Sequence, residues 1–61
     1  MIVDVGHSEY EVEVGGLVIR NDLLGPKMIV GDVFKEAGIV WLKFKCDNGE
    51  STWPASLFVP A

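Results

Sequence analysis

Cysteine and histidine are almost absent from this sequence, because each occurs only once, as Cys46 and His7. A single thiol cannot form a disulfide within the chain, and one cysteine with one histidine falls short of the ligand set of a structural zinc site. We therefore expect no disulfide, no metal site and no bound cofactor. A lone thiol is also typical of proteins from a reducing cytoplasm.

Long apolar runs are absent as well. No stretch approaches the roughly 18 apolar residues of a membrane-spanning helix, and the first residues carry none of the lysine or arginine that opens a secretory signal. The sequence therefore predicts a cytoplasmic protein without a membrane partner.

Positive charge is missing from the first part of the chain. Of the nine acidic residues, four lie within residues 1–14, which leaves five acids to balance all five basic residues in residues 15–61. The net charge of −4 thus comes from the N-terminal segment. An acidic domain is poorly suited to the phosphate backbone that dominates nucleic-acid affinity, so a nucleic-acid partner is not favoured.

A helical period is also lacking, and the apolar residues alternate with polar ones instead, as in β-strands. Within residues 9–14, Tyr10, Val12 and Val14 define an apolar face opposite a row of glutamates. A turn at residues 6–8 joins this strand to a first one. We expect strands at residues 1–5, 9–14, 17–20, 27–34, 39–46, 51–53 and 58–59.

Turn residues separate these strands. Gly15-Gly16 predicts a sharp bend, and Gly31-Asp32 interrupts the strand over residues 27–34. Residues 35–38 have the length of a hairpin turn, and Asn48-Gly49 is typical of a type I′ turn. One turn of 3₁₀ helix is expected at residues 54–57.

The chain has 61 residues, of which 49% are hydrophobic. Ordering a chain of this length costs roughly 90 kcal/mol at about 1.5 kcal/mol per residue, so nearly all of the apolar side chains must be buried. Oligomerisation is a common remedy at this size. Short strands and tight turns predict a single all-β domain, a small barrel.

The segment Gly25-Pro26-Lys27-Met28-Ile29-Val30 resembles the motif of the small uncharacterised YodC-like bacterial proteins. In that family an aromatic strand and a closing Phe-Pro-like step follow, and residues 40–44 and 53–57 occupy those places here. The likeness covers roughly residues 12–61. One glycine instead of two precedes the proline, and Phe44 stands where the family usually has tryptophan.

This resemblance implies a five-stranded SH3-like barrel with a 3₁₀ turn before the last strand, and it brings no established activity. Residues 1–14 lie mostly outside the likeness and are expected to add an acidic strand or hairpin to a single domain over residues 1–61. That hairpin could cap its own barrel or a neighbour's.

Trp41 is the first candidate for a binding residue. Alternation places it with Lys43 and Lys45, on the strand face opposite Val40, Leu42 and Phe44. An indole flanked by cations can anchor a partner, since tryptophan is enriched in binding hot spots. Alternatively, the N-terminal hairpin covers Trp41, or a second subunit does.

The other candidates are weaker. Trp53, before the proline of the closing step, is expected mainly in the core, although in SH3 domains this region lines a peptide groove. Glu9, Glu11 and Glu13 form a carboxylate row, which either attracts a basic partner or is a solvated face that discourages aggregation. We expect His7 to be solvent-exposed in its turn and Cys46 to fill a small space in the core.

Three functions are compatible with these features. The first is a non-enzymatic interaction module that binds a protein partner or self-associates through the face containing Trp41. The second is a nucleic-acid-binding barrel that stacks bases on Trp41 beside Lys43 and Lys45. The third is an oligomeric small-barrel enzyme. Residues Glu50–Pro54 resemble the closing V-Q-I-Y-P stretch of type II dihydrofolate reductases, which are small SH3-like barrels, but Gln, Ile and Tyr are replaced here, so the resemblance extends to the fold only. No residue is identified as catalytic, and we expect no enzyme.

Overall fold

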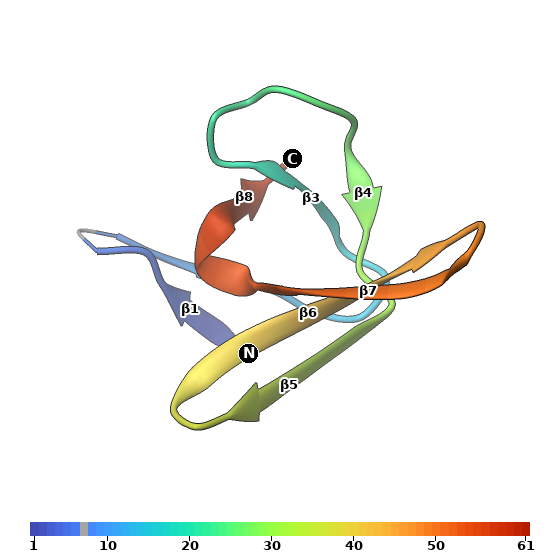
Figure 1. Cartoon of the computed structure of the whole chain (residues 1–61). Helices are drawn as coiled ribbons and strands as arrows, with labels where there is room; N and C mark the ends of the chain where they lie inside the picture. The colour runs from blue at the N-terminus through green and yellow to red at the C-terminus, as the bar shows by residue number, and fades with distance from the viewer. Residues whose placement is uncertain (7) are drawn as a thin grey trace.

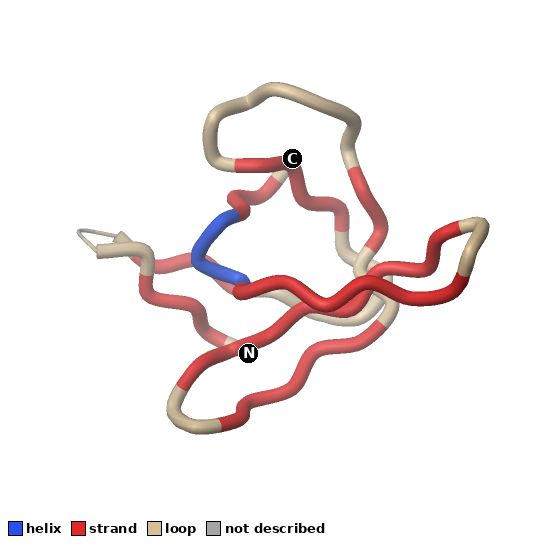
Figure 2. Tube along the Cα trace, in the orientation of Figure 1, coloured by secondary structure: helices blue, strands red, loops and turns tan. Residues whose placement is uncertain are grey.

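The protein is an all-β chain, and the computed structural model describes residues 1–6 and 8–61. The described strands and the one 3₁₀ turn are β1 (Ile2–Asp4), β2 (Glu9–Glu11), β3 (Leu17–Arg20), β4 (Met28–Ile29), β5 (Asp32–Glu36), β6 (Ile39–Cys46), β7 (Gly49–Pro54), η1 (Ala55–Leu57) and β8 (Phe58–Pro60). They form three small antiparallel sheets, β1-β2, β4-β3-β8 and β5-β6-β7 (Figure 1). The all-β prediction is confirmed, as is the 3₁₀ turn, which joins β7 to β8 (Figure 2). No helix in the described part of the chain is long and apolar enough to span a membrane.

The segment expected as one strand over residues 27–34 is divided between two sheets. β4 pairs with β3, whereas β5 pairs with β6. Between them, the amide of Val30 donates to the carbonyl of Gly16 at 3.0 Å, and the amide of Gly31 donates to the carbonyl of Lys43 at 2.8 Å. The interruption seen at Gly31-Asp32 in the sequence therefore marks the crossing from one sheet to the other.

The first hairpin forms as expected, but its second strand is shorter. Val3 pairs with Tyr10, and the strand ends at Glu11 instead of continuing to Val14. The chain turns at once, because the amide of Gly16 donates to the carbonyl of Glu13 at 2.9 Å. Val14 is consequently 64% exposed, and its expected place on the apolar face is wrong.

Two tight turns connect the strands of the sheet β5-β6-β7. At the first, Ala37 and Gly38 both have positive φ angles, of 53° and 78°, as a type I′ turn requires. At the second, Cys46 pairs with Gly49, and the left-handed backbone falls on Gly49, with φ of 127°, and not on Asn48. The predicted hairpin is confirmed, but the expected type I′ turn centred on Asn48-Gly49 is wrong.

The core lies between the sheets and contains residues from all of them. Its buried side chains are Val3, Tyr10, Val12, Val18, Val30, Leu42, Phe44, Ala55 and Phe58. The Tyr10 hydroxyl donates to the carbonyl of Ala55 at 2.6 Å, which fastens the N-terminal hairpin to η1. Burial raises the pKa of Tyr10 to about 12.

This shift predicts a loss of stability at high pH. The pKa of the tyrosine rises from 10.0 in the unfolded chain to about 12 in the folded one, so the unfolded state releases the proton first. The contribution of Tyr10 to the free energy of unfolding is complete below pH 10 and declines toward pH 12. Tyr10 is the only tyrosine, so the ultraviolet absorbance of tyrosinate reports it directly. A native-state midpoint near that of free tyrosine would contradict the burial.

The positive φ angle of Ala37 predicts that glycine would stabilise the protein at this position. An alanine with φ of 53° is in the left-handed region, which glycine adopts without steric conflict. Ala37→Gly should therefore raise the free energy of unfolding by about 1 kcal/mol, measured by urea denaturation. In Ala55→Gly, by contrast, a buried methyl group is lost at a residue outside that region, so this variant should be less stable than the wild type.

Candidate binding surfaces

One face of β6 carries buried core residues, and the other carries Trp41 and two lysines. Leu42 and Phe44 are 0% and 2% exposed and belong to the core. Trp41, Lys43 and Lys45 lie on the opposite side of the strand, and the first two of them are partly buried. The alternation inferred from the sequence is therefore confirmed along this strand.

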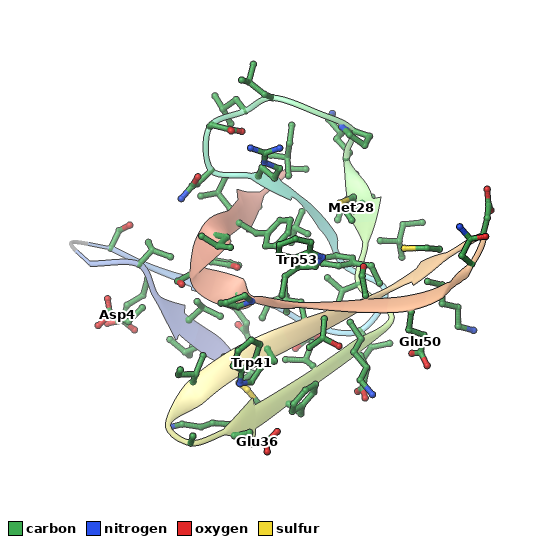
Figure 3. The ribbon with its side chains drawn as sticks, viewed as in Figure 1. Asp4, Met28, Glu36, Trp41, Glu50 and Trp53 are labelled. Atoms are coloured by element: carbon green, nitrogen blue, oxygen red, sulfur yellow. The ribbon has the colours of Figure 1, made fainter. Side chains whose placement is uncertain are left out.

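The neighbouring strands build an apolar row around Trp41. Phe34 of β5 and Pro54 of β7 are the residues directly opposite it on either side. Directly opposite residues share a face of the sheet and their side chains are in reach of one another. The indole Nε1 also donates to the carbonyl of Glu36 at 3.3 Å, which restrains the ring. We call the outer face with Phe34, Trp41 and Pro54 the Trp41 face. Figure 3 labels Trp41 on it.

The described residues of the N-terminal hairpin pack on the side of β6 away from the Trp41 face. The hairpin contributes Val3, Tyr10 and Val12 to the core that contains Leu42, on the other side of β6. Tyr10 is bonded to Ala55 there. The sequence left open whether the hairpin covers its own chain or a neighbouring one. Its described residues cover the core of their own chain.

Charges of both signs surround the aromatic row. Lys43 lies opposite Asp32, and Lys45 lies opposite Glu50. The Nζ atom of Lys43 is 5.6 Å from the centroid of the Phe34 ring, in the range of a cation–π interaction. The Trp41 face is therefore nearly balanced in charge, and it is not a basic surface.

Trp53 is not in the core, contrary to the expectation from the sequence. It pairs with Leu42 and so faces the same side of the sheet, but β7 is an edge strand. As a result, Trp53 is 48% exposed. It lines a groove of about 420 Å³ with residues from the other three-stranded sheet, from the turn after β3 and from η1, namely Arg20, Asn21, Met28, Leu57 and Phe58.

The carboxylate row lies on the surface, as a solvated face would. Glu9 and Glu11 flank Tyr10 in β2, and Glu13 follows the strand; all three are exposed. Glu9 lies directly opposite Asp4, another acid, across the hairpin. Like charges in such a pair repel, so this face contributes charge and no stability.

The remaining single residues form no site. Cys46 is exposed, so its expected role as a core filler is wrong: it stands at the end of β6, with Sγ 3.5 Å from Ser51 Oγ. His7 lies outside the described residues. Across residues 1–6 and 8–61, no three potential metal ligands lie close enough together to hold an ion.

The loop over residues 21–27 is an apolar feature that the strand pattern does not predict. Leu23 and Leu24 are the most exposed large apolar side chains among the described residues, at 67% and 66%. Two adjacent leucines between Asp22 and Gly25 were the available signal, because turn segments are usually polar.

Comparison of the chain with protein-family models, with curated proteins and with solved structures gave no match. The resemblance to the YodC-like proteins therefore stays a prediction.

The two tryptophans should differ in fluorescence. In dilute solution, Trp41→Phe leaves the exposed Trp53 as the only emitter, whereas Trp53→Phe leaves the partly buried Trp41. We expect the first variant to emit at longer wavelength and to be quenched more strongly by acrylamide. Equal quenching of the two variants would contradict the different burial of the two rings.

Proposed function

We propose that this protein is a non-enzymatic interaction module whose Trp41 face binds a protein partner. The observation that carries the proposal is the row of Phe34, Trp41 and Pro54 on one face of the sheet, while the described residues of the hairpin pack on the other face. Tryptophan residues of this kind are over-represented among the few residues that supply most of the energy of an interface.

The Trp41 face is also well ordered before any partner arrives. The indole has a hydrogen bond to the Glu36 carbonyl, and neighbours on both adjacent strands restrict its position. Immobilising a flexible side chain on binding costs about 0.5–1.5 kcal/mol of free energy. This cost is smaller for a ring that is already held in place before binding. This favours binding without rearrangement of the sheet.

The charge pattern favours a protein segment over a nucleic acid. Each lysine of the Trp41 face has an acid directly across the strand, Asp32 for Lys43 and Glu50 for Lys45. Nucleic-acid binding depends on neutralising phosphates with unbalanced cations and weakens steeply with salt. A partner that places an apolar side chain on the indole needs no such excess, and its affinity should change little with salt.

We also propose that the two three-stranded sheets form an SH3-like barrel related to the YodC-like proteins. Support comes from the strand order β4-β3-β8 and β5-β6-β7, in which residues 28–36 contribute to both sheets. The turn η1 between the last two strands fits the same arrangement. The hairpin β1-β2 is then an addition to that barrel.

The proposed function predicts which peptides the protein selects. From a displayed library of random peptides, the immobilised protein should recover sequences with an aromatic or aliphatic anchor. Trp41→Ala should weaken their binding by about 30-fold, the effect of losing a hot-spot side chain worth about 2 kcal/mol. Isothermal titration calorimetry with a synthetic copy of a selected peptide measures this.

Trp53→Ala is the matched control, because it removes the other indole and leaves the Trp41 face intact. It should bind the same peptide as the wild type does. Binding that survives Trp41→Ala, or a library that yields no binder at all, would contradict the proposal. So would preferential, salt-sensitive binding of single-stranded oligonucleotides, which the nucleic-acid hypothesis predicts.

A further inference from the structure

A cleft of about 560 Å³ opens between β4 and the last residues of β6, beside the crossing from one sheet to the other. It is lined by Lys27, Met28, Ile29, Gly31, Phe44 and Lys45, and we call it the lysine cleft. Met28, labelled in Figure 3, also lines the Trp53 groove, but the other members of the two sets differ. A volume of this size is in the range of sites for small organic ligands, about 300–1,000 Å³.

A glycine keeps one side of the lysine cleft open. A Cβ atom at Gly31 would come within 3.9 Å of Lys45 Cγ, which is ordinary contact distance. The stem of Lys45 therefore lies beside the place that a side chain at Gly31 would occupy. Lysines commonly lay their aliphatic stem along a surface and keep the ammonium group in water. Lys45 can in this way serve as a cationic rim of the cleft.

The uncharged part of the lining is apolar. Ile29 is 65% exposed, Met28 is partly buried, and Phe44 is buried. An exposed isoleucine beside a cleft is apolar surface that water covers in the free protein. Covering it with an apolar group of a ligand is favourable, because apolar area is then removed from water.

The charge of the lysine cleft is positive. Lys27 and Lys45 line it, and its lining includes no aspartate or glutamate. Within residues 1–6 and 8–61, the one contact short enough for an ion pair joins Arg20 to Asp22, so neither lysine of the cleft has such a partner there. Glu50 lies across from Lys45 in the strand register and offsets part of this charge. Two lysines and one nearby glutamate complement a ligand with a single negative charge.

We propose that the lysine cleft binds a small organic acid, a carboxylate joined to an apolar chain or ring. The ammonium groups of Lys27 and Lys45 donate hydrogen bonds to the carboxylate, and the apolar part of the acid covers Ile29. Hydrogen bonds between two charged groups are stronger than those between neutral ones. Lysine is a compact charge on a flexible stem, so two lysines can converge on one carboxylate. A phosphate monoester is less suitable, because its second negative charge also faces Glu50.

The test is a titration of the wild type with sodium octanoate, followed by two-dimensional ¹H–¹⁵N nuclear magnetic resonance. The shifts should saturate at one site and be largest in residues 27–31 and 44–45. Octanol has the same chain without the charge and acetate has the charge without the chain, so each should bind at least about tenfold more weakly than octanoate. Octyl phosphate should not bind more tightly than octanoate.

Substitutions of the two lysines separate this site from general attraction of anions. Lys27→Gln and Lys45→Gln should each weaken octanoate binding about threefold, and the double variant about tenfold, as expected for exposed ion pairs. Both lysines are exposed, so the variants should keep the wild-type spectrum away from the cleft. Lys35→Gln is the matched control, because Lys35 is an exposed lysine of the same sheet that does not line the cleft. It should bind octanoate like the wild type.

Four outcomes would overturn the proposal. They are shifts that do not saturate or that centre on the Trp53 groove, octanol or acetate that binds as tightly as octanoate, octyl phosphate that binds more tightly, and a double variant that binds like the wild type. Trp41→Ala should leave octanoate binding unchanged, so the result is independent of peptide binding by the Trp41 face.

Discussion

The two three-stranded sheets meet at Val30 and Gly31, where the chain leaves β4 and enters β5. Val30 is 1% exposed and exchanges backbone hydrogen bonds with the Gly15-Gly16 bend, at 2.8 and 3.0 Å. Gly31 lies so close to β6 that an added Cβ atom would come within 3.2 Å of the Lys43 carbonyl oxygen. This close approach sets the position of one sheet on the other.

The crossing between the sheets determines which side chains remain uncovered. On the inside, Leu42 and Phe44 pack with residues of the hairpin and of the sheet β4-β3-β8. On the outside, Trp41 is partly buried between Phe34 and Pro54, the residues directly opposite it on the two neighbouring strands. At the edge of the same sheet, Trp53 of β7 lines a groove and is not packed beneath another strand of that sheet. One packing arrangement thus produces two separate apolar surfaces.

The alternation of apolar and polar residues predicted much of this structure. It identified the strand class and the two faces of β6, and turn residues added the first hairpin and the 3₁₀ turn, because each depends on neighbours in sequence. Alternation failed for Val14 and Cys46, and the resemblance to SH3-like barrels failed for Trp53, because their exposure depends on where a strand ends or which strand lies at an edge. Such facts arise from long-range packing and leave no local pattern. The exposure of Leu23 and Leu24 is different, because two adjacent leucines in a turn segment were a local signal for it.

The described residues of the N-terminal hairpin are buried on the other side of β6 from the Trp41 face. Nuclear Overhauser contacts of the two rings concerned test this most directly. The indole protons of Trp41 should show contacts to Phe34 and Pro54 and none to residues 1–14, while the Tyr10 ring should contact Ala55. Contacts between the Trp41 indole and Val3 or Tyr10 would contradict the account, because the hairpin would then cover the proposed binding face.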